Sequence, residues 1–193
     1  LPAMAIFHLV CANTHSLFIL GWGAMGCFVL GLWVASRRLD KRLLGWSLAS
    51  VVVTFINPYG WRGVLFPFSL ATRLQSENLF GQSIGEFVSP FDLGLTQQFP
   101  FHPRLPIYCY RILELLAVVA IVPLLKRRKF SCVLLLIVFL SLSAMMIRNV
   151  PLLVIAGRPL IAWALPASGL LARLRLRPLL VPMVALATVI LGL

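Results

Sequence analysis

The chain has 193 residues, of which 61% are hydrophobic and only 11% are charged. Soluble domains carry about 25% charged residues, so this composition excludes an ordinary soluble fold and favours an all-α membrane protein. The net charge of +12 comes from short basic clusters between apolar runs and not from a basic face interleaved with aromatics, which excludes a nucleic-acid partner.

Apolar runs of about 17 to 25 residues predict helices that span a bilayer. The clearest run is 16–36, which contains no charge, whereas 43–56 is short and needs Lys41 and Arg42 to snorkel. The chain begins and ends inside apolar runs, so we expect a fragment of one polytopic transmembrane helix bundle, 1–193. Its predicted spans are 1–12 (truncated), 16–36, 43–56, 107–125, 131–147, 150–165 and 179–193 (truncated).

The basic clusters predict the orientation of these spans. Cytoplasmic loops of membrane proteins are enriched in Lys and Arg. Alternation of the spans places three basic loops on one side, which we therefore expect to be the cytoplasm: 37–42, 126–130 and 170–177. The opposite side, outside a plasma or bacterial inner membrane, then receives 13–15, 57–106 and 148–149.

The long outer segment, 57–106, is predicted to be more than a linker. Asn57-Pro58-Tyr59-Gly60 is a turn signal that ends the preceding helix. Tyr59 and Trp61 suit the headgroup level, and 64–74 is predicted to form a short interfacial helix. Connections of this length are usually functional or disordered, and the aromatics here argue against disorder.

Polar residues of the outer loops are the candidates for chemistry. Asn13 and His15 either cap and turn the chain or contact a ligand, where the imidazole can transfer a proton. Glu86 is either a solvated loop charge or a general base or cation ligand. Arg148-Asn149 either anchors the interface or recognises phosphate through the guanidinium fork. The four cysteines have no metal-ligand spacing, and no metal site is predicted.

Three charges lie inside predicted spans: Arg111, Glu114 and Arg158. Charges in the bilayer are costly and are normally paired or line a wet cavity. Glu114 and Arg158 fall at similar depth from the outer side. We therefore expect a structural ion pair between Glu114 and Arg158. Nucleotide-binding loops, dinucleotide fingerprints, zinc-protease motifs and serine-hydrolase motifs are missing from the sequence.

Four motifs resemble, in order and spacing, one family of large bacterial membrane proteins related to the GT-C glycosyltransferases, which are mannosyltransferase-like. The resemblance covers about residues 10 to 165, the middle of such a protein. The motifs are Asn13-x-His15 before the apolar run 18–31, Asn57-Pro58-Tyr59-Gly60 with Pro67 downstream, Glu86-Phe87-x-Ser89-Pro90, and Arg148-Asn149-x-Pro151-Leu152.

The resemblance implies transfer of a sugar from a polyprenyl-phosphate donor on the extracytoplasmic face, with the family's defining acidic motif expected upstream of Leu1. It implies Glu86 and His15 as catalytic candidates, and a divalent cation is compatible with carboxylate ligands. The candidate substrate-binding residues are Asn13, Asn57, Tyr59, Arg148 and Asn149. Two alternatives stay open: an O-antigen ligase or polymerase type of protein, and a transporter or flippase, which would favour inverted repeats that the sequence does not show.

Overall fold

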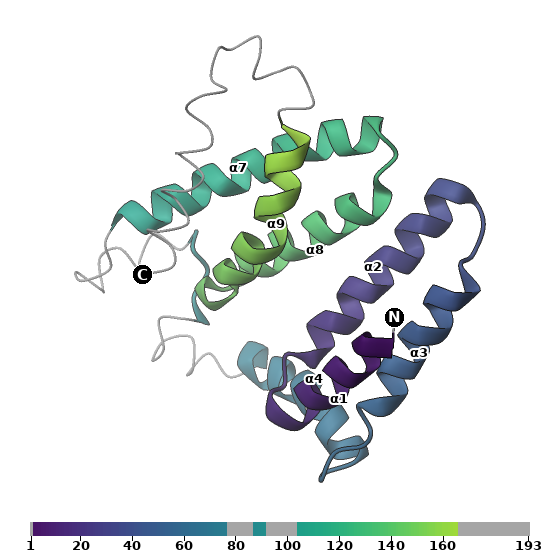
Figure 1. Ribbon diagram of the computed structural model, residues 1–193. Helices are drawn as coiled ribbons and strands as arrows, with labels where there is room; N and C mark the ends of the chain where they lie inside the picture. Colours follow the sequence, from purple (N-terminus) through teal and green to yellow (C-terminus); the bar gives the residue numbers. More distant parts are fainter. Residues whose placement is uncertain (1, 77–86, 92–103, 166–193) are drawn as a thin grey trace. The chain divides into compact units, whose positions relative to one another are not determined.

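The computed structural model describes residues 2–76, 87–91 and 104–165. All regular elements of these residues are helices, which confirms the predicted all-α class (Figure 1). The chain divides into two compact units, Leu1–Leu79 and Phe80–Leu193. The first unit contains α1 (Pro2–Thr14), α2 (Phe18–Ser36), α3 (Lys41–Val53) and α4 (Trp61–Ser76). The second contains α7 (Arg104–Lys126), α8 (Phe130–Met145), the 3-10 helix η2 (Ile147–Asn149) and α9 (Val150–Ala164).

Each predicted span before residue 166 overlaps a helix, with bounds that differ by up to three residues, and the predicted span 179–193 lies outside the described residues. The helix predicted at 64–74 is α4, which begins three residues earlier, at Trp61. Two stretches of the described chain are long and apolar enough to cross a membrane: α2 with 19 residues, and η2 with α9, Ile147–Ala164, with 18 residues. The helices α1 and α8 are apolar but shorter.

The turn between α2 and α3 uses a charged residue at each helix end. The helix α2 ends at Ser36, and Arg37 adopts a left-handed conformation with φ 55° while its N–H donates to Trp33 O. Asp40 then caps α3, because its carboxylate accepts from Arg42 N and Leu43 N at 3.0 Å. A carboxylate here also stabilises the positive end of the helix dipole. The basic cluster therefore surrounds a well-defined helix–helix turn.

Packing in the first unit relies on small and polar residues. Ser47, Ser50 and Thr54 lie three and four residues apart at one side of α3, and all three are buried. The helices α1 and α3 are in extensive contact. Small residues let helix backbones approach closely, which is how helices associate in lipid. The residues that α3 buries are thus small and carry a hydroxyl group.

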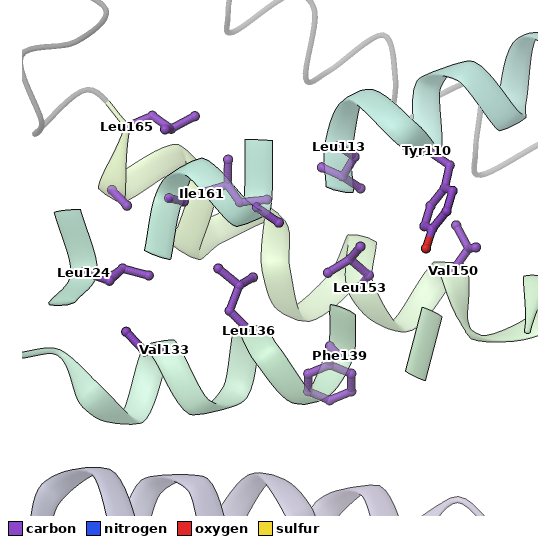
Figure 2. Close-up of a cluster of buried hydrophobic side chains, with 13 residues drawn as sticks. Tyr110, Leu113, Leu124, Val133, Leu136, Phe139, Val150, Leu153, Ile161 and Leu165 are labelled. Carbon is purple, nitrogen blue, oxygen red and sulfur yellow. The ribbon is translucent and has the colours of Figure 1, made fainter. Parts of the chain in front are cut away.

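The second unit has a conventional apolar core between α7, α8 and α9. Figure 2 shows Leu124, Leu136 and Leu153 among the side chains that converge there, and all three are fully buried. Successive helices are joined by short connections, so neighbours run antiparallel. The basic turn 126–129 and η2 therefore lie at opposite ends of this helical unit.

Candidate functional site

A cavity of about 610 Å³ lies in the first unit, where two connections predicted to face outward meet. One connection joins α1 to α2 and the other joins α3 to α4. Most of the wall comes from polar or aromatic residues of these connections and of the helix ends that flank them. The lining residues are Ala12, Asn13, Thr14, His15, Ser16, Phe18, Asn57, Tyr59, Arg62, Gly63 and Phe66.

Asn13 joins the two connections. Its side-chain N–H2 donates to Leu9 O at 2.8 Å within α1 and to Ile56 O at 3.0 Å in the connection that follows α3. Both amide hydrogens are used in these bonds, which leaves the Oδ1 oxygen as the acceptor available to a ligand. The predicted alternatives for Asn13 are therefore compatible: the residue organises the turn and also lines the cavity.

Asn57 shapes the second connection. Its side-chain N–H2 donates to Thr54 O at 2.8 Å and to Gly60 O at 2.9 Å, and its Oδ1 accepts from Tyr59 N at 2.8 Å. Gly60 has a φ of 52°, which glycine adopts without strain. A Cβ at Gly63 would collide with the Asn57 side chain, so glycine leaves the room that this turn needs. Asn57, predicted to contact substrate, thus uses its donors on the backbone.

Arg62 provides the cavity's positive charge, and His15 provides a neutral imidazole. His15 Nδ1 accepts from Leu17 N at 3.1 Å, so the proton of the neutral imidazole is on Nε2. Arg62 lies over the ring of Trp61, with Cζ 5.7 Å from the ring centroid. The lining residues that the structure describes include no carboxylate. A wall with one guanidinium, one imidazole and several amide or hydroxyl groups suits an anion.

Arg62 was not singled out from the sequence. The available signal was its place in the outer segment, directly after Trp61 and two residues beyond the turn motif. Tyr59, in contrast, lines the cavity and is 76% exposed, as a residue at the headgroup level would be.

In the second unit, the structure brings together two motifs that are about 60 residues apart in sequence. The segment 87–91 packs on η2 and on the end of α8: Ile147 N donates to Val88 O at 3.0 Å and Ser89 Oγ donates to Ala144 O at 2.9 Å. Arg148 lies over the ring of Phe87, with Cζ 5.7 Å from its centroid. The exposed Arg148 is therefore held beside the residue that follows Glu86, while Glu86 itself lies outside the described residues.

Asn149 closes the end of α8. Its side-chain N–H2 donates to Leu142 O at 2.9 Å, so this predicted substrate-binding residue satisfies a carbonyl at the helix terminus. Its contact with a substrate stays a prediction.

The sequence predicts that Glu114 pairs with Arg158 on another helix. In the structure its partner lies on its own helix, α7. Tyr110 Oη donates to Glu114 Oε1 at 3.0 Å and lies 3.1 Å from Ser143 Oγ. Arg158 is exposed, because the buried face of α9 passes through Gly157 and Ile161 instead. The described part of the chain contains no Glu114–Arg158 ion pair, so the rotation of α9 about its axis decides against the expected geometry.

The described residues contain no cluster of three or more His, Cys, Asp or Glu that could hold a metal ion. The cavity in the first unit can bind an anion through Arg62 and His15 and can accept a hydrogen bond through Asn13. Comparison of the chain with protein families, with curated proteins and with solved structures finds no match in any of the three.

Proposed function

We propose that this chain is part of a multi-pass membrane protein of the bacterial cell envelope that binds a polyprenyl-phosphate-linked sugar on its extracytoplasmic face and transfers the sugar. One observation carries the proposal. Two connections, each predicted from the basic loops to face outward, meet in one cavity with cationic and hydrogen-bonding groups and no carboxylate on its described wall.

Different residues of the cavity are proposed to bind different parts of the donor. Arg62 and the Nε2–H of His15 donate to phosphate oxygens, since charge-assisted bonds to phosphate are among the strongest in proteins. The free Oδ1 of Asn13 accepts from a sugar hydroxyl. Tyr59 and Phe66 place aromatic surface at the level where a lipid headgroup leaves the hydrocarbon.

The catalytic step is assigned to Glu86, which we propose as the general base that deprotonates the acceptor hydroxyl. Arg148 lies over the ring of Phe87, the residue that follows Glu86, and we propose that its guanidinium binds a phosphate oxygen. If the reaction uses a divalent cation, carboxylates of the outer segment such as Glu86 would hold it.

Binding of polyprenyl phosphate to the purified full chain, measured by native mass spectrometry, tests the site. Arg62→Gln should weaken binding by about tenfold or more, because a charged hydrogen bond contributes about 1.5–3 kcal/mol. His15→Gln should weaken it less, since a neutral donor remains. Arg38→Gln is the matched control: this arginine is exposed in the basic turn between α2 and α3 and should leave binding unchanged.

Polyprenol, which lacks the phosphate, separates headgroup recognition from lipid partitioning. We expect polyprenol to bind much more weakly than polyprenyl phosphate and to be insensitive to Arg62→Gln. Equal binding of the two lipids, or an equal effect of Arg38→Gln, would contradict a phosphate site in this cavity.

A further inference from the structure

A second cavity, of about 620 Å³, lies in the second unit between α7, α8 and the segment 87–91. Two opposite charges and an apolar surface share its wall. The lining residues are Phe91, Arg111, Glu114, Leu115, Val118, Leu140, Ser141 and Ala144. This cavity has no part in the function proposed above.

Arg111 enters the cavity with unmet hydrogen-bonding capacity. Its guanidinium lies over the ring of Phe91, with Cζ 5.9 Å from the centroid. Its Nε is buried and has no acceptor among the residues that the structure describes. A buried donor without an acceptor is costly, more so when it is charged. The terminal nitrogens of this guanidinium are not among the buried atoms without a partner, and they are the donors that remain available to a ligand in the cavity.

Glu114 is oriented by Tyr110, which lies one turn earlier on the same helix. Tyr110 Oη holds Glu114 Oε1 at 3.0 Å and is itself fixed by Ser143 Oγ at 3.1 Å. The second carboxylate oxygen is left for the cavity. Arg111 and Glu114 are three residues apart on one helix face, a spacing at which oppositely charged side chains can pair. Within residues 87–91 and 104–165 no direct ion pair joins the two, although the Arg111 charge is close enough to act on the Glu114 carboxylate.

Charge complementarity limits what can fill this space. A simple anion would satisfy Arg111 but face the Glu114 carboxylate, and a simple cation would do the reverse. A ligand with both charges satisfies the two residues together. Apart from Ser141, the rest of the described wall is apolar, and Leu115 and Val118 are 64% and 52% exposed. These side chains offer contact to a hydrocarbon part.

We propose that this cavity binds a zwitterionic amphiphile. The anionic group of the ligand meets the Arg111 guanidinium, its primary ammonium meets the free oxygen of Glu114, and its apolar part lies along Leu115, Val118 and Leu140. This chemistry exists in the headgroup of an ethanolamine phospholipid and in a free apolar amino acid. The proposal is independent of the cavity in the first unit, because it rests on residues of the second unit alone.

The full chain is first tested against phospholipids that differ only in the headgroup, by native mass spectrometry. If the source is a lipid, phosphatidylethanolamine should bind at least about tenfold tighter than phosphatidylglycerol, which lacks the ammonium, and phosphatidylcholine, whose ammonium has no N–H to donate. Glu114→Gln should remove this preference. Arg111→Gln should weaken the binding of phosphatidylethanolamine and of phosphatidylglycerol to the same extent. Arg158→Gln, a change at an exposed arginine of α9, is the matched control and should alter neither the headgroup preference nor the affinity for either lipid.

A second arm uses free leucine and the protein in phosphatidylcholine nanodiscs. Leucine binding that Arg111→Gln and Glu114→Gln both reduce by about tenfold or more, with no headgroup preference in the first arm, identifies the free source. The headgroup comparison on the unmodified chain needs no variant, so a variant that fails to fold does not affect it. The proposal is overturned if the chain shows neither the headgroup preference nor the variant-sensitive leucine binding. It is also overturned if Arg158→Gln has an effect equal to that of Arg111→Gln.

Discussion

The imidazole of His8 shows how one residue sets the distance between two helices. Its ring is buried in the first unit, where Nδ1–H donates to Met4 O at 2.8 Å within α1. The ring lies against Gly21 of α2, and a Cβ at that position would overlap it. The Nε2 has no partner among the described residues. Glycine at position 21 is thus required by space, since its φ is not in the left-handed region.

We expect Gly21→Ala to destabilise the protein by about 1–3 kcal/mol, because an added methyl in a packed interface forces side chains off their preferred positions. Thermal unfolding in detergent, followed by circular dichroism, measures the effect. Gly26→Ala on the same helix is the control: a Cβ there meets nothing within 4 Å, so the change should be neutral or slightly stabilising. Equal losses from both variants would show that His8 does not limit the approach of α2.

At the scale of an element, two helices end on an arginine in the left-handed conformation. Arg37 follows α2 and Arg128 follows α7, each with a φ of 55°. Helices commonly end this way, but glycine is the usual residue. Arginine is tolerated here at some cost and places a positive charge at the negative end of the helix dipole. Both positions belong to basic clusters predicted to be cytoplasmic, so the same residues end the helix and carry the orientation signal.

Arg37→Val should lower the free energy of unfolding by about 1–2 kcal/mol, because a β-branched side chain is strained at positive φ. Arg37→Gly should stay close to the wild type, since glycine adopts this conformation freely. Arg38→Val, one residue along and without positive φ, removes the same charge and serves as the control. Melting temperatures of the three variants in one detergent give the comparison, and a matching loss for Arg38→Val would assign the effect to charge.

At the scale of the whole molecule, each unit has a turn rich in basic residues at one of its ends. In the first unit the basic turn 37–42 lies at the end of α2 and the start of α3, opposite the end where Asn13 bonds Ile56 O. In the second unit the basic turn 126–129 lies opposite the contact between 87–91 and η2. Each unit by itself therefore has the end-to-end asymmetry that the positive-inside rule associates with a spanning orientation.

Cysteine labelling in intact cells tests the predicted orientation. In a background where the cysteines are replaced by serine, Tyr59→Cys should react with a membrane-impermeant maleimide from outside, because this position is exposed and predicted to be extracytoplasmic. Leu39→Cys, also exposed, should react only after the cells are permeabilised. The reverse pattern would invert the topology, and labelling of both in intact cells would contradict a membrane between them.

The sequence alone determined the helices of the described chain and their class. The chain consists of long apolar runs interrupted by basic clusters and by the turn Asn57-Pro58-Tyr59-Gly60. Such runs have few alternatives to a helix, because backbone groups in an apolar environment must bond within their own helix. The sequence also predicted that Asn13, His15, Asn57 and Tyr59 lie on one side of the bilayer, and the structure places all four on the wall of one cavity.

Only the tertiary structure decided which partner each polar group takes. Asn13 meets a carbonyl 43 residues away, and Ser89 meets one 55 residues away. Such pairings depend on how each helix is rotated about its axis, and a rotation of one residue moves a side chain by about 100°. For this reason Glu114 bonds Tyr110 while Arg158 faces outward, and Arg62 provides the cavity's charge. Apolar runs define where a helix lies along the chain, whereas packing against its neighbours defines which side of it faces the site.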